Sequence, residues 1–342
     1  MISTQIERPK RQEYKGLAVQ YLVNNGSRKT AIMVPGVGIP GKEFGWMYSL
    51  RSLGFNAVYA PYRGTWFSKG EFLPSNTGKL SVTDDVTDLI EFSLEKLDST
   101  EVIVVGDCFG SSPALVASAR YKEVSKVFLY GGMIFSDDPS LNKKYANAVN
   151  GNGVKRDKVA ALGQTLANAA TDGGEYFNGY AGFDINVWQQ MILGQTELVP
   201  HKVIPELAKK RIMIMHSAND SLVDYERSVD FFGALRSYCK RNKLRTKAKL
   251  KIINGGKGHR SGFGTRQELQ AMWFLKKGCL TFPKAVYTAH KGIKAHKKGV
   301  QRPDQSWFGA PFYDLIVDQI REFQDKGLLH DQPLEKILNR IF

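Results

Sequence analysis

Short apolar runs that alternate with segments of helical periodicity constrain the fold of this chain more than any other feature. Most of the runs are continuously apolar, as expected for strands that are covered on both faces. The strand-like runs are residues 16–23, 30–34, 56–60, 101–105, 126–130, 211–215 and 250–253, and the helix-like segments include residues 83–97, 112–119, 225–238 and 266–277. This order predicts an α/β fold with a mostly parallel sheet, flanking helices and right-handed crossovers.

The first two strand-like runs are separated by the turn-like sequence Asn24-Asn25-Gly26-Ser27. We therefore expect these two runs to form a hairpin. Residues 35–41, which follow the second run, are too rich in Gly and Pro to continue as a strand or to start a helix.

The spacing of the runs predicts a core with one long insertion and a tail. About eighty residues separate Tyr130 from Arg211, which is too long for a single crossover in a compact domain. The expected organisation is an α/β core over residues 15–133 and 209–280, a partly helical cap or lid over residues 134–208, and a basic and then helical C-terminal appendage over residues 281–342. No segment repeats at a fixed period, which excludes solenoids and propellers.

The composition favours a soluble protein. The chain has 342 residues, 42% of them hydrophobic, which is enough for a substantial core. No apolar run approaches the roughly 20 residues that span a bilayer, and the first ten residues lack the apolar stretch of a secretory signal. The three cysteines, Cys108, Cys239 and Cys279, are odd in number and widely spaced, which suggests neither a disulfide framework nor a zinc site. We expect a cytoplasmic protein without a metal or a cofactor.

The positive charge is concentrated in one region. The formal net charge is +15, yet residues 236–302 alone contain 19 Lys or Arg and one acid, Glu268. A solvated basic face is the simplest interpretation. Such a face also attracts anionic partners, so nonspecific binding to nucleic acid or to an anionic membrane surface is a second hypothesis for region 236–302.

The pentapeptide Gly106-Asp107-Cys108-Phe109-Gly110 lies between an apolar strand-like run and a helix-like segment. This G-x-C-x-G pattern predicts a nucleophile elbow, a sharp turn in which the central residue has a strained backbone and small neighbours make room for it. A helix N-terminus directly after Cys108 would favour its thiolate form. The alternative interpretation is a buried structural cysteine beside a glycine turn.

Two downstream segments favour the catalytic interpretation. Asp220 lies in a loop after the run 211–215, and His259 lies in a glycine-rich loop after the run 250–253. The chain order is therefore nucleophile, acid and histidine, each shortly after a strand.

These segments together resemble the α/β-hydrolase family over roughly residues 15–280. A cysteine in the elbow is similar to the dienelactone hydrolases, whereas most members carry serine. The sequence Pro61-Tyr62-Arg63-Gly64-Thr65-Trp66, continued to Phe72, resembles the Y-R-G-x-W-x-S-x-G-x-F loop of certain esterase-like and peptidase-like members. The resemblance implies the α/β-hydrolase fold with Cys108, Asp220 and His259 as a catalytic triad.

In such a site His259 takes the thiol proton and later donates one to the leaving group, while Asp220 fixes the histidine tautomer. The N–H of Phe109 is one expected oxyanion donor, and the second is expected from the turn after Val34, with Val37 as the leading candidate. Pro35 stands where a histidine often precedes the glycine in the family, so the sequence departs from the usual pattern at this second donor.

Several other residues could compete for these roles. His216 matches a position that is usually structural in the family, and we expect it to pack near the acid loop. Asp224 is a rival acid that we expect to cap the next helix, and Ser111 follows the elbow and should already lie in a helix. Three further histidines lie outside the strand-end pattern: His201, His290 and His296.

The sequence therefore predicts a hydrolase that cleaves an ester, thioester or related acyl bond of a small-molecule acyl substrate through an acyl-enzyme. An acyltransferase stays open as an alternative. The rival of a different class is a catalytically silent α/β-hydrolase scaffold that binds a ligand or an anionic partner. The intact acid and histidine argue against such a loss of activity.

Overall fold

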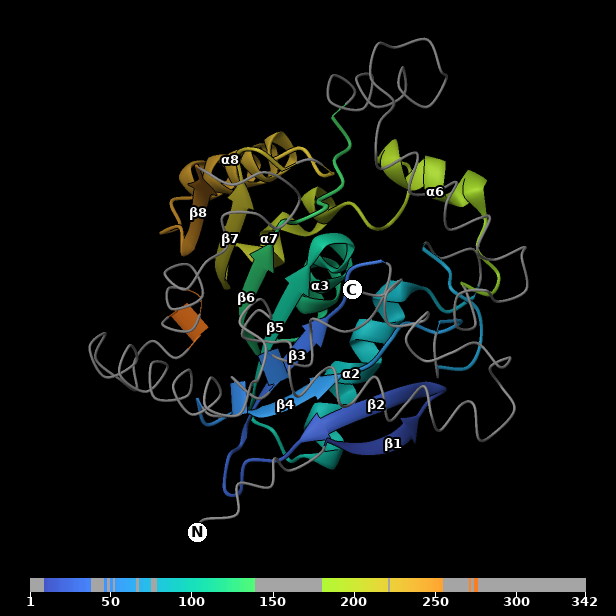
Figure 1. The fold of residues 1–342 in the computed structure, drawn as a ribbon. Helices are drawn as coiled ribbons and strands as arrows, with labels where there is room; N and C mark the ends of the chain where they lie inside the picture. Colours follow the sequence, from blue (N-terminus) through green and yellow to red (C-terminus); the bar gives the residue numbers. More distant parts are fainter. Residues whose placement is uncertain are drawn as a thin grey trace, which may run out of the picture.

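The computed structural model describes residues 9–37, 46–47, 50–51, 53–65, 68–74, 79–138, 180–220, 222–254, 271 and 274–275. Within this part of the chain, one sheet of eight strands forms the centre of the molecule (Figure 1). The strand order is β1-β2-β4-β3-β5-β6-β7-β8. The strands are β1 (Lys10–Tyr14), β2 (Leu17–Leu22), β3 (Lys29–Val34), β4 (Asn56–Tyr59), β5 (Glu101–Asp107), β6 (Val124–Tyr130), β7 (Arg211–Ser217) and β8 (Ala248–Ile253).

The sheet is parallel from β4 to β8 and antiparallel at one end, where β2 pairs with both β1 and β4. Because β3 and β5 to β8 are parallel neighbours, their carboxyl ends lie along the same edge of the sheet. The register places Val34 beside Gly106, Asp107 beside Tyr130, and Ser217 beside Ile253. This edge therefore collects the loops that follow the strands.

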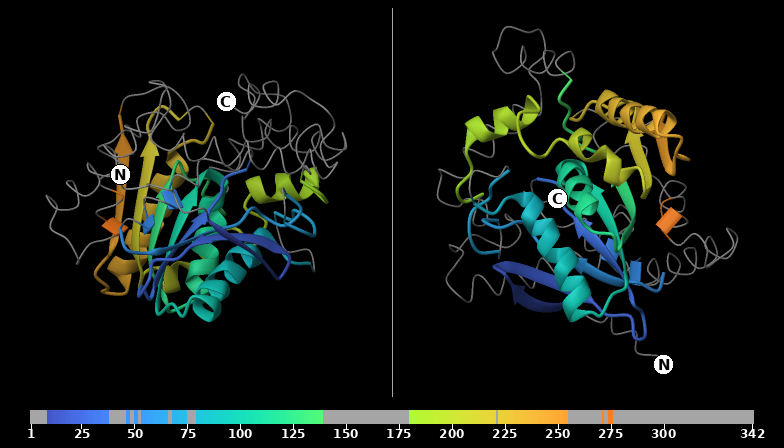
Figure 2. Two further views of the ribbon diagram at one scale, coloured as in Figure 1. Left: turned by 60° about the horizontal axis from the view of Figure 1, so that its bottom comes forward. Right: turned by 180° about the vertical axis from the view of Figure 1, so that it is seen from behind.

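Helices and loop segments cover both faces of the sheet. The helices are α2 (Val82–Lys96), η1 (Cys108–Gly110), α3 (Ser111–Arg120), α6 (Ile185–Ile192), η2 (Pro200–Val203), α7 (Ile204–Leu207) and α8 (Glu226–Arg241). Figure 2 shows α2 and α3 in front of the sheet when the molecule is seen from behind. Side chains of α2, α3 and α8 pack with Ile32, Val104 and Ile214 on this face, whereas the alternate residues Met33 and Val105 pack on the other face. The prediction of strands buried on both faces is thus confirmed, and so is the α/β fold class.

The predicted hairpin between residues 16–23 and 30–34 is wrong. β2 pairs with β1 and β4, while β3 lies between β4 and β5. The Asn24–Ser27 segment does form a turn, with the Ser27 N–H donating to the Asn24 carbonyl at 2.9 Å. However, the side chain of Asn56 accepts from the Asn24 N–H and donates to the Ser27 carbonyl, at 2.8 and 3.1 Å. These contacts hold the first residue of β4 against the turn, and β4 occupies the place beside β2.

The hairpin of this sheet instead joins β1 and β2, and β1 was not predicted. Four of the five residues of β1 are exposed and its sequence is KRQEY, so it lacks the apolar run that marks the other strands. Its turn is Lys15-Gly16, with φ angles of 49° and 85°. Two consecutive positive φ values are typical of the two-residue turn that matches the twist of a hairpin.

None of the helices in the described ranges is both long enough and apolar enough to cross a bilayer. The predicted cap, residues 134–208, is described only in part, and the predicted tail, residues 281–342, lies wholly outside the described residues. Residues 139–179 and 276–342 lie outside the described residues, as do most of the predicted helix 266–277 and the two histidines His290 and His296.

Candidate functional site

A sharp turn between β5 and α3 carries Cys108. Its φ angle is 50°, in the left-handed region that a non-glycine residue rarely adopts. The helical segment that starts at Cys108 continues into α3 at Ser111, so the cysteine lies at the amino-terminal end of helical backbone. The predicted placement of Ser111 within a helix is confirmed.

Two glycines on either side of Cys108 allow this turn to close. A Cβ atom on Gly106 would lie 2.9 Å from the carbonyl oxygen of Gly110 and from the Cα atom of Ser111. A Cβ atom on Gly110 would lie 2.5 Å from the carbonyl oxygens of both Val34 and Pro35. Both positions exclude any side chain unless the backbone shifts. The second contact also places the end of β3, where Val37 follows, directly against the Cys108 turn.

The turn is also fixed from the side of β6. The Cys108 carbonyl accepts a hydrogen bond from the Met133 N–H at 2.8 Å. The Ser112 hydroxyl donates to the Met133 carbonyl and accepts from the Phe135 N–H, both at 3.0 Å. The Cys108 side chain is a free thiol and the residue is 3% exposed. The chain therefore leaves β6 toward the cap region by passing directly over the start of α3.

Asp220 lies in the loop after β7, in a buried position with several donors. Its Oδ1 atom accepts from the backbone N–H groups of Leu222 and Val223, each at 2.8 Å. Its Oδ2 atom is 3.2 Å from Nε2 of His216, and both side chains are at most 1% exposed. These contacts give both carboxylate oxygens a partner and fix the orientation of the carboxylate.

His216 packs against the loop that carries Asp220, as we predicted from its position in the sequence. Nε2 is 3.1 Å from the Val223 carbonyl oxygen, and Nδ1 is 2.7 Å from the Ser228 hydroxyl. Because a carbonyl oxygen only accepts, Nε2 carries a hydrogen. The same Nε2 hydrogen faces the Asp220 carboxylate, so His216 supports the acid.

The other predicted site residues differ in how far the structure describes them. Asp224 accepts from the N–H of Glu226, the first residue of α8, at 3.0 Å, but Tyr225 holds the N-cap position, so Asp224 lies one residue before the predicted cap. His259 lies outside the described residues, five positions beyond the last one that follows β8. The ends of β5 and β7 are separated by β6, which places Cys108 and the Asp220 loop about two strand spacings, or ~10 Å, apart along the edge.

Arg63 of the Y-R-G-x-W loop is a buried anchor. Its guanidinium forms ion pairs with Asp85 and Asp88 of α2, and its Nη2 atom donates to the Lys15 carbonyl at 2.6 Å. The Arg63 N–H also donates to Asp85, at 2.9 Å. Arg63 therefore attaches this loop to α2 and to the β1–β2 turn. Trp66 lies outside the described residues.

Tyr62, the neighbour of Arg63, contacts both sides of the Cys108 turn, and the sequence analysis gave it no role. Its hydroxyl donates to the Pro35 carbonyl at 2.7 Å. Its ring packs edge-on against Phe109, with 5.7 Å between the centroids and 84° between the planes. Phe109 is fully buried and stacks on Trp188 of α6, at 5.6 Å and 22°. Helix α6 is thus joined to the sheet through the residue next to Cys108.

A second polar contact joins the cap region to the core. The Ser136 hydroxyl donates to Oδ2 of Asp230 in α8 at 2.9 Å, and Nε2 of His201 is 2.8 Å from the same oxygen. The contact with His201 and the hydrogen bond from Ser136 lower the pKa of Asp230. Ser136 lies where the cap region begins and His201 lies where it returns, so one carboxylate holds both ends. Asp230 lies between Ser136 and His201, whereas in a catalytic triad the histidine lies between the acid and the nucleophile. This group therefore does not activate the serine hydroxyl.

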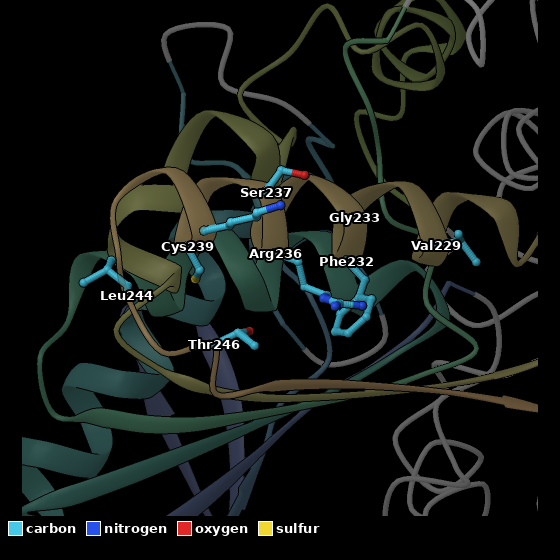
Figure 3. Close-up of a pocket in the computed structure, with 9 residues that line it drawn as sticks. Val229, Phe232, Gly233, Arg236, Ser237, Cys239, Leu244 and Thr246 are labelled. Atoms are coloured by element: carbon cyan, nitrogen blue, oxygen red, sulfur yellow. The ribbon is translucent and has the colours of Figure 1, made fainter.

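The described part of the basic region forms an exposed face around the end of α8. Residues 231–254 contain eight Lys or Arg and no acid. Seven of them are exposed and form no ion pair with a described residue: Arg236, Lys240, Arg241, Lys243, Arg245, Lys247 and Lys249. A hollow of about 660 Å³ lies on this face, lined by Arg236, Lys240 and Thr246 and by the apolar side chains of Phe232 and Leu244 (Figure 3). Within the described residues, no group of three or more His, Cys, Asp or Glu could hold a metal ion.

The sequence matches no protein-family model and no curated protein. Solved structures, in contrast, share its fold. An esterase from Pyrococcus furiosus is 14% identical, with a TM-score of 0.53 over 79% of this chain and 90% of the esterase. A soluble variant of monoglyceride lipase from Saccharomyces cerevisiae is 16% identical, with a TM-score of 0.53 over 80% of this chain and 95% of the lipase. The chain therefore has the α/β-hydrolase fold.

Proposed function

We propose that this chain is a hydrolase that cleaves an ester, thioester or related acyl bond through a covalent thioester on Cys108. The observation that carries the proposal is the backbone of Cys108. A non-glycine residue with φ of 50° is held between two glycines that admit no side chain, at the start of helical backbone. Strain of this kind persists only where the surroundings enforce it, and it is characteristic of a nucleophile elbow.

The proposed reaction uses Cys108, Asp220 and His259. His259 removes the thiol proton, and the thiolate sulfur attacks the acyl carbonyl carbon to form a tetrahedral oxyanion. The oxyanion accepts hydrogen bonds from the N–H groups of Phe109 and Val37. As the intermediate collapses, the bond to the leaving group breaks and His259 returns the proton to it. Water, deprotonated by His259, then attacks the thioester, and the products are the carboxylic acid and the free thiol.

The surroundings of these residues support this assignment. The packing of Gly110 against Pro35 brings the loop of Val37 next to the Phe109 peptide, where both expected donors are needed. Asp220 is buried and receives two backbone N–H groups and the His216 imidazole, so its carboxylate is ready to orient a histidine from the loop after β8. The esterase and lipase that share the fold act on acyl esters by name.

The test uses two cysteines of equal burial. Cys108 is 3% exposed and Cys239, in α8, is 2% exposed, so exposure alone cannot distinguish their reactivity. We expect iodoacetamide to modify Cys108 first, and p-nitrophenyl acetate to release a burst of one equivalent of p-nitrophenol. Cys108→Ala should remove the burst and Cys239→Ala should retain it.

Other results would reject or change the proposal. Preferential modification of Cys239 or Cys279, together with no turnover of p-nitrophenyl acetate, would leave the silent scaffold as the better interpretation. A burst followed by faster turnover when an alcohol or thiol acceptor is added would indicate an acyltransferase.

A further inference from the structure

The Tyr62 hydroxyl and the Pro35 carbonyl form a buried hydrogen bond of 2.7 Å. Tyr62 is 4% exposed and comes from the loop after β4, whereas Pro35 follows β3. A proline has no N–H group, so the carbonyl oxygen is the polar group through which the Pro35 backbone can be held. The hydroxyl therefore fixes the orientation of the Pro35–Gly36 peptide.

The same carbonyl lies against the Cys108 turn from the other side. The position of a Cβ atom on Gly110 is 2.5 Å from the Pro35 oxygen, which leaves no space for this peptide to move toward α3. The next peptide along the chain, Gly36–Val37, carries the Val37 N–H. Its direction depends on the peptide before it, because only the two dihedral angles of Gly36 separate the two planes.

The Tyr62 ring contacts Phe109, the residue that carries the other expected donor. It packs edge-on against Phe109 at 5.7 Å, and Phe109 is fixed on its other side by Trp188, at 5.6 Å. The backbone N–H of Phe109 is the other expected oxyanion donor. One side chain thus contacts the strand-end loop through its hydroxyl and the elbow through its ring.

We infer that Tyr62 is a positioning residue that sets the distance and angle between the Val37 and Phe109 N–H groups in the oxyanion hole. The inference rests on the proposed function. Tyr62 does not contact the reacting atoms in this role. Its hydroxyl acts on the Val37 donor through the Pro35 carbonyl, so its loss weakens only those steps in which an oxyanion forms.

The experiment compares two reactions of the same cysteine in Tyr62→Phe. Acylation by p-nitrophenyl acetate passes through a tetrahedral oxyanion, whereas alkylation by iodoacetamide is a displacement at carbon and forms none. Removing a whole oxyanion donor costs about 100- to 1000-fold, so we expect a misplaced donor to slow the acylation burst by about tenfold. The rate of alkylation and the KM should change by less than about twofold.

Tyr14→Phe is the matched control. Tyr14 lies in β1, and both of its partners lie in α2, away from Cys108. Its hydroxyl donates to Glu95 at 2.9 Å, and its ring packs edge-on against Phe92 at 5.4 Å. Its acylation and alkylation rates should equal those of the wild type.

The results separate three situations. If Tyr62→Phe slows acylation and alkylation equally, Tyr62 has only a structural role, and if it slows neither, the inference is rejected. If wild-type Cys108 is alkylated but never acylated, the proposed function itself is wrong and the role of Tyr62 in it is rejected as well.

Discussion

Gly110 is the residue where the Cys108 turn has the least space. Its φ angle is −59°, an ordinary helical value, so any L-residue could adopt its backbone. The obstacle to a side chain is the pair of backbone oxygens of Val34 and Pro35, 2.5 Å from the Cβ position. Crowding by backbone atoms is harder to relieve than crowding by a flexible side chain, because the strand end itself must move.

We therefore expect Gly110→Ala to lower the free energy of unfolding by about 1–3 kcal/mol and to remove the acylation burst. Gly233→Ala is the control, since its Cβ atom would meet nothing within 4 Å in α8. This control should raise stability by about 0.5–1 kcal/mol, the helix propensity difference between the two residues. Urea denaturation of both variants measures the effects, and a Gly110→Ala protein with wild-type stability and burst would contradict the packing described for the turn.

At this scale the sequence allows prediction of some site residues but not of their supports. The G-x-C-x-G pattern predicts the turn at Cys108 because the glycines are local requirements of its geometry. The bond from Tyr62 to Pro35 joins residues 27 positions apart, and it exists only because β3 and β4 are neighbours in the sheet. No local sequence pattern predicts a contact between residues so far apart in the chain. The link from Ser136 and His201 to Asp230 is unpredictable for the same reason.

At the scale of elements, prediction succeeded where apolar side chains mark a buried strand and failed where they do not. The run 101–105 corresponds to β5, and the segment 83–97 corresponds to α2 within one residue at each end. β1 was missed because an exposed edge strand needs no apolar face. The wrong hairpin shows that a turn sequence predicts a reversal of direction but not which strand fills the space beside it.

Contacts between elements also have a pH dependence. Glu91 of α2 accepts hydrogen bonds from Lys15, in the β1–β2 turn, and from the Tyr121 hydroxyl, after α3, the latter at 2.7 Å. The bond from Lys15 and then that from Tyr121 lower the pKa of Glu91. Because the folded pKa is lower than the unfolded value of about 4.3, the stabilisation is present above that value and is lost as the pH falls through the folded pKa.

Glu91→Gln should therefore lower the free energy of unfolding by about 0.5–1 kcal/mol at pH 7, and the difference from the wild type should shrink as the pH falls below the unfolded pKa of about 4.3. Urea titrations at several pH values between 3 and 7 give this difference directly. Glu206→Gln serves as the control, because Glu206 is exposed and forms no ion pair with a described residue. A difference that persists unchanged at pH 3 would show that the effect of Glu91→Gln is not electrostatic.

At the scale of the whole molecule, the Cys108 turn and the described part of the basic region lie on different elements. Cys108 follows the carboxyl end of β5, whereas the described cations of region 236–302 lie on α8, on the loop after it and on β8, the strand at the edge of the sheet. Part of this charge has a structural explanation. Lys240 and Arg241 lie in the last turn of α8, where cations interact favourably with the helix dipole, and Lys249 lies on an edge strand, where lysine opposes aggregation.

These explanations leave Arg236, Lys243, Arg245 and Lys247 as exposed cations with no ion pair to a described residue. Of these four, Arg236 lines the hollow beside α8 in Figure 3. Together with Lys240, Arg241 and Lys249, these four make seven exposed like charges between residues 236 and 249, which produce a strong local potential that an anionic polymer relieves. We therefore expect the protein to bind a single-stranded oligonucleotide without preference for its sequence. The binding constant should fall steeply with salt, with a slope of about −0.7 for each phosphate contacted.

The double variant Arg236→Glu/Lys240→Glu tests whether this face is responsible. It should flatten the salt slope measured by fluorescence anisotropy, because two contacts are lost and two repulsions are added. Lys96→Glu/Lys122→Glu makes the same change in net charge at exposed positions of α2 and of the loop after α3, and it should retain most of the slope. If both double variants weaken binding equally, net charge rather than this face governs the attraction. Binding that does not depend on salt, or equal binding by all three proteins, would reject an electrostatic partner for the basic region.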